Sequence, residues 1–191
     1  MPPPVQRVDL QLDLGGETVD LATRALAAAV VSTPRYGREG EVLAGVAAAR
    51  QAGAALADVS LEPRLIGPAV QRGGLPVVAR TATIEQAEAA RAAGIALVLV
   101  TPELGAHAAA EGWPTALVVD DVGEIDAVRA EAERHGFPLA IDTTHRPATD
   151  ALAQESVAVA SGCRIVRTTD VRRTRRVIEV VAAVLEARRE D

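Results

Sequence analysis

The sequence has 191 residues, of which 49% are apolar and 24% charged, and its formal net charge is −6. This length suits one domain with a substantial core, and the balance of apolar and charged residues is that of an ordinary globular protein. The acidic charge argues against a nucleic-acid partner and against a polybasic membrane contact.

All twenty basic residues are arginine, so no lysine is present to act as a base, a Schiff-base former or a phosphate ligand. The single cysteine, Cys163, cannot form an intrachain disulfide, which fits a reducing compartment. The first residues lack the basic-then-apolar pattern of a signal peptide, and no apolar run approaches the ~20 residues needed to cross a bilayer. We therefore expect a cytoplasmic protein without membrane contact.

The first elements along the chain are predicted to form a β-hairpin within residues 1–24. Val8–Leu14 alternates in polarity, Gly15 and Gly16 form a turn signal, and Thr18–Leu21 is the partner strand.

Short β-branched runs then alternate with Ala-rich helical stretches, which is typical of repeated β/α units. The predicted strands are Leu26–Thr33, Ala55–Leu61, Pro76–Thr81, Ile95–Val100, Thr115–Asp120, Pro138–Thr143 and Arg164–Thr169. The predicted helices are Glu39–Ala52, Ile84–Ala93, Glu103–Glu111, Glu124–His135, Thr149–Ser161 and Arg173–Arg188. Glycines fall between a helix and the next strand, where a helix cap is favoured: Gly53, Gly94, Gly112, Gly136 and Gly162.

These repeats predict a single α/β domain over residues 1–191. Parallel β/α units either close into a barrel or form an open doubly wound sheet, and the pattern alone does not choose between them. An eight-unit barrel usually has about 250 residues, so a barrel of this length would be a shortened one. In both architectures the functional side chains lie at the C-terminal ends of the strands and in the loops that follow.

Those strand ends carry two sets of charged residues. The arginines are Arg35, Arg64, Arg80, Arg146 and Arg167, and the carboxylates are Asp58, Glu62, Asp120, Asp121, Asp142 and Asp170. A guanidinium at a barrel mouth needs a carboxylate or phosphate partner. Either the two sets neutralise one another, or the arginines form an anion site for phosphate or pyrophosphate.

His145 lies just beyond a predicted strand and is the best-placed histidine for a site, whereas His107 and His135 fall on predicted helices. No second His or Cys lies at metal-ligand spacing, so the residues themselves predict no metal site. The sequence also has no phosphate-loop, dinucleotide-binding or serine-hydrolase motif.

The segment 162–171, Gly-Cys-Arg-Ile-Val-Arg-Thr-Thr-Asp-Val, resembles the last strand of dihydropteroate synthase. That family reads Gly-Ala-x-Ile-Val-Arg-Val-His-Asp-Val at this strand. Five further segments resemble earlier stretches of the family in the same order, and the leading hairpin is similar to the one that closes the bottom of its barrel. The segments are 31–34, 56–62, 76–81, 118–123 and 136–146.

The resemblance covers about the whole chain and implies a fold. It implies a TIM-barrel-like (β/α) barrel of the dihydropteroate synthase type, with an N-terminal β-hairpin. One β/α unit is missing between Val100 and Thr115. Either seven strands close the barrel, or this gap leaves its wall open.

The family joins p-aminobenzoate to a dihydropterin in folate biosynthesis, displacing pyrophosphate with the help of Mg²⁺. The resemblance implies that Arg167 is the pyrophosphate-binding arginine and that Arg146 replaces a pterin-contacting lysine. It also implies that Asp120 or Asp121 is the pterin-binding aspartate. Arg64 lies where a mobile loop of the family carries an arginine.

Other positions depart from the family. Its metal-ligating Asn corresponds to Val31, so the Mg²⁺ that the resemblance implies as a cofactor has lost a ligand. A pterin-binding Asp corresponds to Arg80, and a pyrophosphate-binding His corresponds to Thr169. Losing one charged contact to a transition state typically costs several kcal/mol, so efficient synthesis of dihydropteroate is not expected.

Three hypotheses follow: a divergent transferase, a non-catalytic homologue (a pseudoenzyme) that binds a pterin or a phosphate-type anion, and a barrel whose mouth charges only pair internally. In either of the first two, the predicted substrate-binding residues are Arg64, Arg80, Asp120, Asp121, His145, Arg146 and Arg167. The resemblance also implies a homodimer through the C-terminal helices or a partnership with an active synthase. Val177–Leu185 offers an apolar stripe for either contact, although packing on the barrel explains it equally well.

Overall fold

The computed structural model describes residues 11–13, 18–20, 25–31, 38–59 and 63–190. Its strands are β1 Gln11–Asp13, β2 Thr18–Asp20, β3 Leu26–Val31, β4 Leu56–Val59, β5 Val77–Thr81, β6 Leu97–Val100, β7 Thr115–Val119, β8 Leu139–Asp142 and β9 Ile165–Thr168. Its helices are α1 Glu39–Gln51, α2 Pro63–Arg72, α3 Ile84–Ala92, α4 Pro102–Ala110, the 3₁₀ turn η1 Val122–Glu124, α5 Ile125–His135, α6 Ala148–Ala160 and α7 Val171–Glu190.

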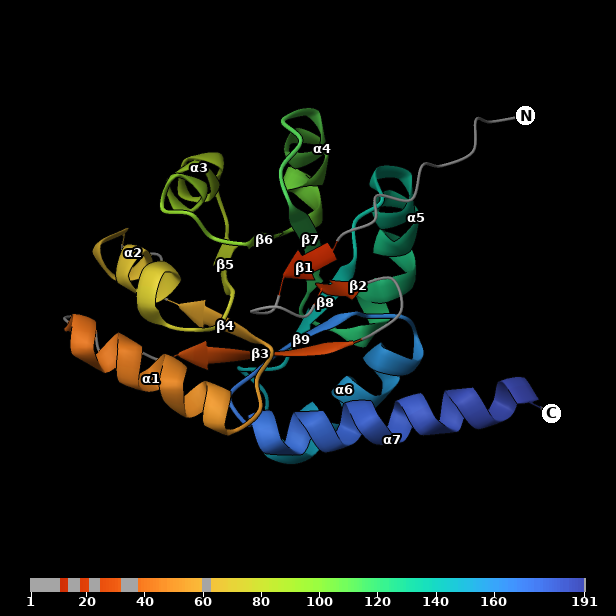
Figure 1. The fold of residues 1–191 in the computed structure, drawn as a ribbon. Helices are drawn as coiled ribbons and strands as arrows, with labels where there is room; N and C mark the ends of the chain where they lie inside the picture. Colours follow the sequence, from red (N-terminus) through yellow and green to blue (C-terminus); the bar gives the residue numbers. More distant parts are fainter. Residues whose placement is uncertain (1–10, 14–17, 21–24, 32–37, 60–62, 191) are drawn as a thin grey trace.

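Strands β3 to β9 form a closed parallel barrel in chain order, and the helices surround it (Figure 1). The last strand pairs with the first through Leu26 and Ile165, which completes the circle. Strands β6 and β7, on either side of the shortened region, pair directly through Leu99 and Ala116. Seven strands therefore close the barrel, and the alternatives of an open wall and of an open doubly wound sheet are wrong.

The barrel interior is apolar at the N-terminal ends of its strands. Inward-facing residues alternate with residues that face the helices, because successive side chains of a strand point to opposite faces. The interior residues Leu26, Leu56, Leu97, Ala116 and Ile165 are all at most 3% exposed and pack in one cluster. Val19 of β2 belongs to the same cluster and is 4% exposed, so the predicted hairpin packs against the barrel interior.

The glycine positions of the sequence pattern are confirmed as left-handed helix ends. Gly53, Gly94, Gly112, Gly136 and Gly162 have φ between +63° and +97°. A residue with a Cβ is strained in this region, whereas glycine is not. The repeated glycines therefore end each helix and turn the chain into the next strand.

Helix α2 was not predicted, because Gly67 and Pro68 lie inside it and both are unfavourable in a helix interior. The helix forms because Leu65, Ile66 and Ala69 are buried against the barrel. A signal for it exists: Gly74, with φ +70°, lies two residues beyond its end, like the other capping glycines. Arg64, expected in a loop, is instead the second residue of this helix.

Predicted element ends otherwise differ from the structure by a few residues at most within the described ranges. Parts of the predicted hairpin, including its Gly15–Gly16 turn, lie outside them. Across the described residues, no helix is both long enough and apolar enough to cross a membrane.

Candidate functional site

The uppermost layer of the barrel interior is charged. Two residues after an apolar inward position, each of four strands places a charged side chain in the same interior. The pairs are Leu56 and Asp58 on β4, Val78 and Arg80 on β5, Ala140 and Asp142 on β8, and Ile165 and Arg167 on β9. Because all seven strands are parallel, these four side chains meet at the C-terminal mouth, where β/α barrels carry their sites. We call them the charged layer.

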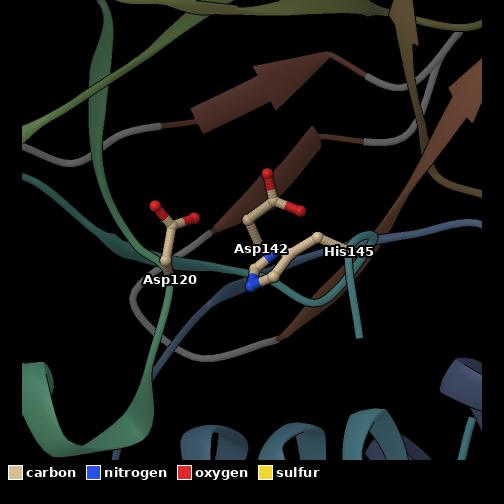
Figure 2. Close-up of side chains that lie close together, drawn as sticks. All are labelled: Asp120, Asp142 and His145. Carbon is tan, nitrogen blue, oxygen red and sulfur yellow. The ribbon is translucent and has the colours of Figure 1, made fainter. Parts of the chain in front are cut away.

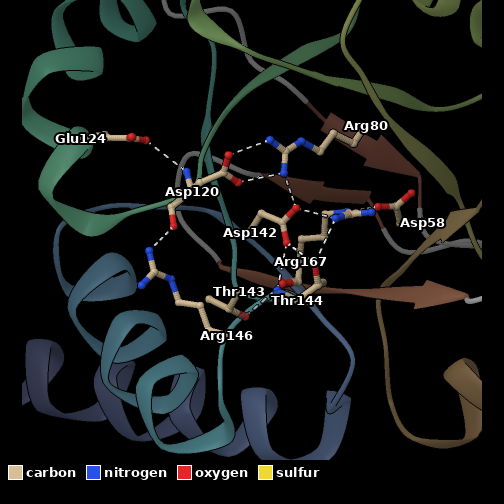
Figure 3. A network of polar contacts seen from close by, with 9 residues as sticks. All are labelled: Asp58, Arg80, Asp120, Glu124, Asp142, Thr143, Thr144, Arg146 and Arg167. Atoms are coloured by element: carbon tan, nitrogen blue, oxygen red, sulfur yellow. Dashed lines mark hydrogen bonds and ion pairs between the residues drawn. The ribbon is translucent and has the colours of Figure 1, made fainter.

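Asp142 is the centre of the charged layer and is 1% exposed (Figure 3). Its Oδ2 accepts hydrogen bonds from Nη1 of Arg80 and Nη1 of Arg167. Its Oδ1 accepts bonds from the amide of Thr144 at 3.0 Å and from the hydroxyl of Thr144 at 2.6 Å. Burial opposes ionisation of Asp142, but these hydrogen bonds and the charge of Arg167 outweigh it, so its pKa lies below the usual value.

Arg167 on β9 links this centre to Asp58 on β4, across β3. Its Nε donates to Oδ2 of Asp58, and Asp58 is only 3% exposed. Burial raises the pKa of Asp58, and the nearby charge of Arg167 offsets part of that effect. Arg167, the predicted pyrophosphate ligand, is thus engaged by two carboxylates of its own chain.

Arg80 joins Asp142 to Asp120, which follows β7. Nη1 of Arg80 lies 2.8 Å from Oδ1 of Asp120, and Nη2 lies 2.9 Å from Oδ2. This two-bond geometry is the strongest form of an arginine–carboxylate contact. The hydrogen bond to Asp120 is the main cause of a raised pKa for Arg80.

Asp120 and Asp121, which the sequence could not separate, have different roles. Asp120 points at Arg80, whereas Asp121 accepts a 2.7 Å bond from the amide of Gly123 and caps η1. Arg146 joins them, because its Nη2 donates to the backbone oxygen of Asp120 and to Oδ2 of Asp121, both at 2.7 Å. Asp120 is therefore the aspartate in the mouth.

Several predicted site residues lie apart from the charged layer. Arg64 is exposed on α2, and Thr169 is exposed after β9. Asp170 accepts a bond from the amide of Arg173 at the start of α7, which is a helix-capping role. Arg35 and Glu62 lie outside the described residues.

His145 lies beside the charged layer and is exposed (Figure 2). One ligand atom from each of Asp120, Asp142 and His145 lies within 4.8 Å of the others, a grouping that sequence spacing did not reveal. The residues present do not fit Mg²⁺, however. Both carboxylates already hold the guanidinium of Arg80, a positive charge that opposes a second cation.

A second polar group that the sequence did not single out lies behind the barrel wall. Glu155 of α6 is fully buried, and its Oε1 accepts bonds from Thr143 at 3.0 Å and Arg173 at 3.3 Å. Thr143 follows Asp142 and is buried as well. This contact fixes the end of β8 and with it the position of Asp142. Only its position on the buried face of α6 distinguishes Glu155 from other helix glutamates, so the sequence analysis did not identify it.

The closed parallel barrel and its charged mouth define the chain as a β/α barrel of the TIM type. No protein-family model matches the sequence, and neither does a curated protein. Solved structures of dihydropteroate synthase do match. The enzyme from Vibrio fischeri matches with a TM-score of 0.67 and 15% identity, covering 92% of this chain and 98% of the other.

Two more structures agree. The Yersinia pestis enzyme with a pterin–sulfa conjugate has a TM-score of 0.66 and 17% identity, over 93% of this chain and 99% of the other. The Xanthomonas albilineans enzyme in complex with 7,8-dihydropteroate has a TM-score of 0.63 and 18% identity, over 92% and 98%. The chain thus has the fold of dihydropteroate synthase, which confirms the fold expected from the resemblance.

Proposed function

We propose that this chain is a non-catalytic homologue of dihydropteroate synthase that binds a pterin-class ligand at the barrel mouth. The observation that carries the proposal is the charge balance there. Among the described residues of the charged mouth, three carboxylates, Asp58, Asp120 and Asp142, face two guanidinium groups, Arg80 and Arg167, so acidic groups outnumber basic ones. Arg146 and Asp121 neutralise each other beside them.

This balance favours a ligand that donates hydrogen bonds over an anion. Pyrophosphate would have to take Arg167 from Asp58 and Asp142, and breaking buried ion pairs is costly. The aminopyrimidinone edge of a pterin instead presents two adjacent N–H donors, which a carboxylate accepts with both oxygens. Asp120 is the accessible carboxylate, because its side chain is 48% exposed while that of Asp142 is 1% exposed.

The absence of catalysis follows from the same contacts. A synthase must stabilise the charge of the departing pyrophosphate in the transition state. Arg167 is neutralised by its own chain, Thr169 stands in place of a histidine, and Val31 stands in place of a metal ligand. These differences remove interactions that would stabilise the departing pyrophosphate, so the barrier to synthesis stays high.

Two measurements test the proposal. With p-aminobenzoate, dihydropterin pyrophosphate and Mg²⁺, we expect no dihydropteroate above the uncatalysed background. In thermal denaturation we expect dihydropterin to raise the Tm, since ligand at ~100 Kd stabilises by about 2.7 kcal/mol, and pyrophosphate to leave it unchanged. Turnover that disappears in the Arg167→Ala variant would establish a synthase instead. A rise with pyrophosphate alone would establish an anion site.

A second candidate role, self-association through α6 and α7, is favoured by exposed apolar side chains. Leu152 and Val157 on α6 are 44% and 50% exposed, and Val180 and Val184 on α7 are 62% and 48% exposed. Such a group of side chains on adjacent helices is typical of an interaction surface. Light scattering tests it: we expect a dimer for the wild type and a monomer for the Val180→Glu variant. A monomeric wild type contradicts the role.

A further inference from the structure

The mouth of the barrel already contains a group with the donor geometry of the proposed ligand. The guanidinium of Arg80 places two parallel N–H groups on the two oxygens of Asp120, at 2.8 and 2.9 Å. Its Nη1 also donates to Asp142 (Figure 3). Amidinium ions, guanidinium ions and the aminopyrimidinone edge of a pterin present the same pair of adjacent donors.

Asp120 is held in place independently of Arg80. Its amide donates to Oε2 of Glu124 at 3.2 Å, and its backbone oxygen accepts from Arg146 at 2.7 Å. The main chain of Asp120 therefore keeps its position at the mouth when Arg80 is absent, and the carboxylate stays within reach of a ligand. An acceptor on a fixed main chain binds a matching donor at a lower ordering cost than one on a mobile segment.

We propose that Arg80 is a resident occupant of the ligand site, an autoinhibitory contact that an amidine-type ligand displaces from Asp120. The same two carboxylate oxygens cannot hold both donor pairs in this geometry. The inference rests on the proposed function for the identity of the natural ligand, a pterin. The role of Asp120 and Asp142 as a hydrogen-bond acceptor for such donors does not depend on which ligand is the natural one.

Arg80 is the arginine of the charged layer that leaves most readily. Its side chain is 28% exposed, compared with 17% for Arg167, and it lies at the outer edge beside the half-exposed Asp120. When it moves out, Asp142 keeps its bonds from Arg167 and Thr144. The network behind Asp120 thus survives the exchange.

Chemical rescue of the Arg80→Ala variant tests the acceptor directly. We expect low-millimolar guanidinium or acetamidinium chloride to raise the Tm of this variant in a saturable manner. The wild type should show no rise, nor should the Arg175→Ala variant, which loses an exposed arginine paired with Glu179 on α7. Urea and sodium chloride are the controls for hydrogen bonding without charge and for ionic strength.

The Arg80→Met variant, which keeps an apolar stem, serves if Arg80→Ala does not fold. Rescue that fails in the folded variant, or that is equal with sodium, overturns the inference. Dihydropterin is then titrated into both proteins. If Arg80 occupies the site about 90% of the time or more, its removal should tighten binding at least tenfold.

The outcomes separate the two proposals. Guanidinium rescue without dihydropterin binding to either protein supports the resident-arginine inference and contradicts the pterin-binding function. Equal binding of dihydropterin to wild type and variant, without rescue, supports the function and contradicts the inference.

Discussion

The two ends of the barrel interior are built on opposite principles. At the N-terminal end, Leu56, Ala140 and Ile165 are fully buried and are held by packing alone. Two residues further along the strands, Asp58, Asp142 and Arg167 are held by ion pairs and hydrogen bonds. The same strands therefore carry an apolar layer that stabilises the barrel and, nearer the mouth, a charged layer whose groups must compensate one another. The difference shows which part of the interior is available for ligand chemistry.

The largest effect is expected from breaking the charged layer at its centre. In Asp142→Asn, Arg80 and Arg167 lose a shared buried carboxylate, and removing one partner of a buried ion pair costs about 3–5 kcal/mol. Urea denaturation measures the change. The Asp126→Asn variant, whose carboxylate is 94% exposed, is the matched control and should lie near the wild type. A loss as small as that of the control contradicts the structural role of Asp142.

The stability that Asp142→Asn loses relative to the wild type should no longer be missing in acid. The pKa of Asp142 is lowered in the folded chain, so its contribution is complete above the ordinary carboxyl pKa of about 3.9. It disappears as the pH falls through the lowered folded value. The stability gap between wild type and Asp142→Asn should therefore be largest at neutral pH and shrink below about pH 4. A gap that stays constant from neutral to acid pH would show that ionisation of Asp142 is not its source.

Truncating the apolar layer should destabilise the barrel without pH dependence. Leu56→Ala removes a fully buried side chain, and such changes cost about 2–5 kcal/mol depending on how far the cavity collapses. Denaturation at neutral and acid pH should give the same difference from wild type. A difference that follows pH would mean that the two layers are energetically coupled.

Much of this contrast was accessible from the sequence. The alternation of β-branched runs with capping glycines predicted all seven barrel strands. The C-terminal ends of those strands pointed to Arg80, Asp120 and Arg167 as candidate site residues. The pattern could not show that Arg80 faces Asp120 rather than a ligand, because β5 and β7 are 40 residues apart in this contact. It also missed α2, because Gly67 and Pro68 inside it are unfavourable in a helix, whereas the burial of Leu65 and Ile66 stabilises it.

Replacing the whole charged layer should cost no stability. Asp58→Leu, Arg80→Met, Asp142→Leu and Arg167→Met combined exchange compensated charges for apolar groups, which is often neutral or stabilising by about 1–4 kcal/mol. We expect an equal or higher Tm and complete loss of dihydropterin binding. A large loss of stability would mean that the ion pairs, and not ligand binding, are the reason for this layer.

The smallest effect is expected from Mg²⁺. Asp120, Asp142 and His145 lie close enough to share a cation, but the guanidinium of Arg80 already pairs with both carboxylates. Millimolar Mg²⁺ should leave the Tm of the wild type where sodium chloride of the same ionic strength leaves it. A saturable rise with Mg²⁺ would show that an ion displaces Arg80. Without that rise, the charged layer differs from a metal centre in a definite way: its positive charge is covalently part of the chain, and an external ligand gains access only by exchanging with it.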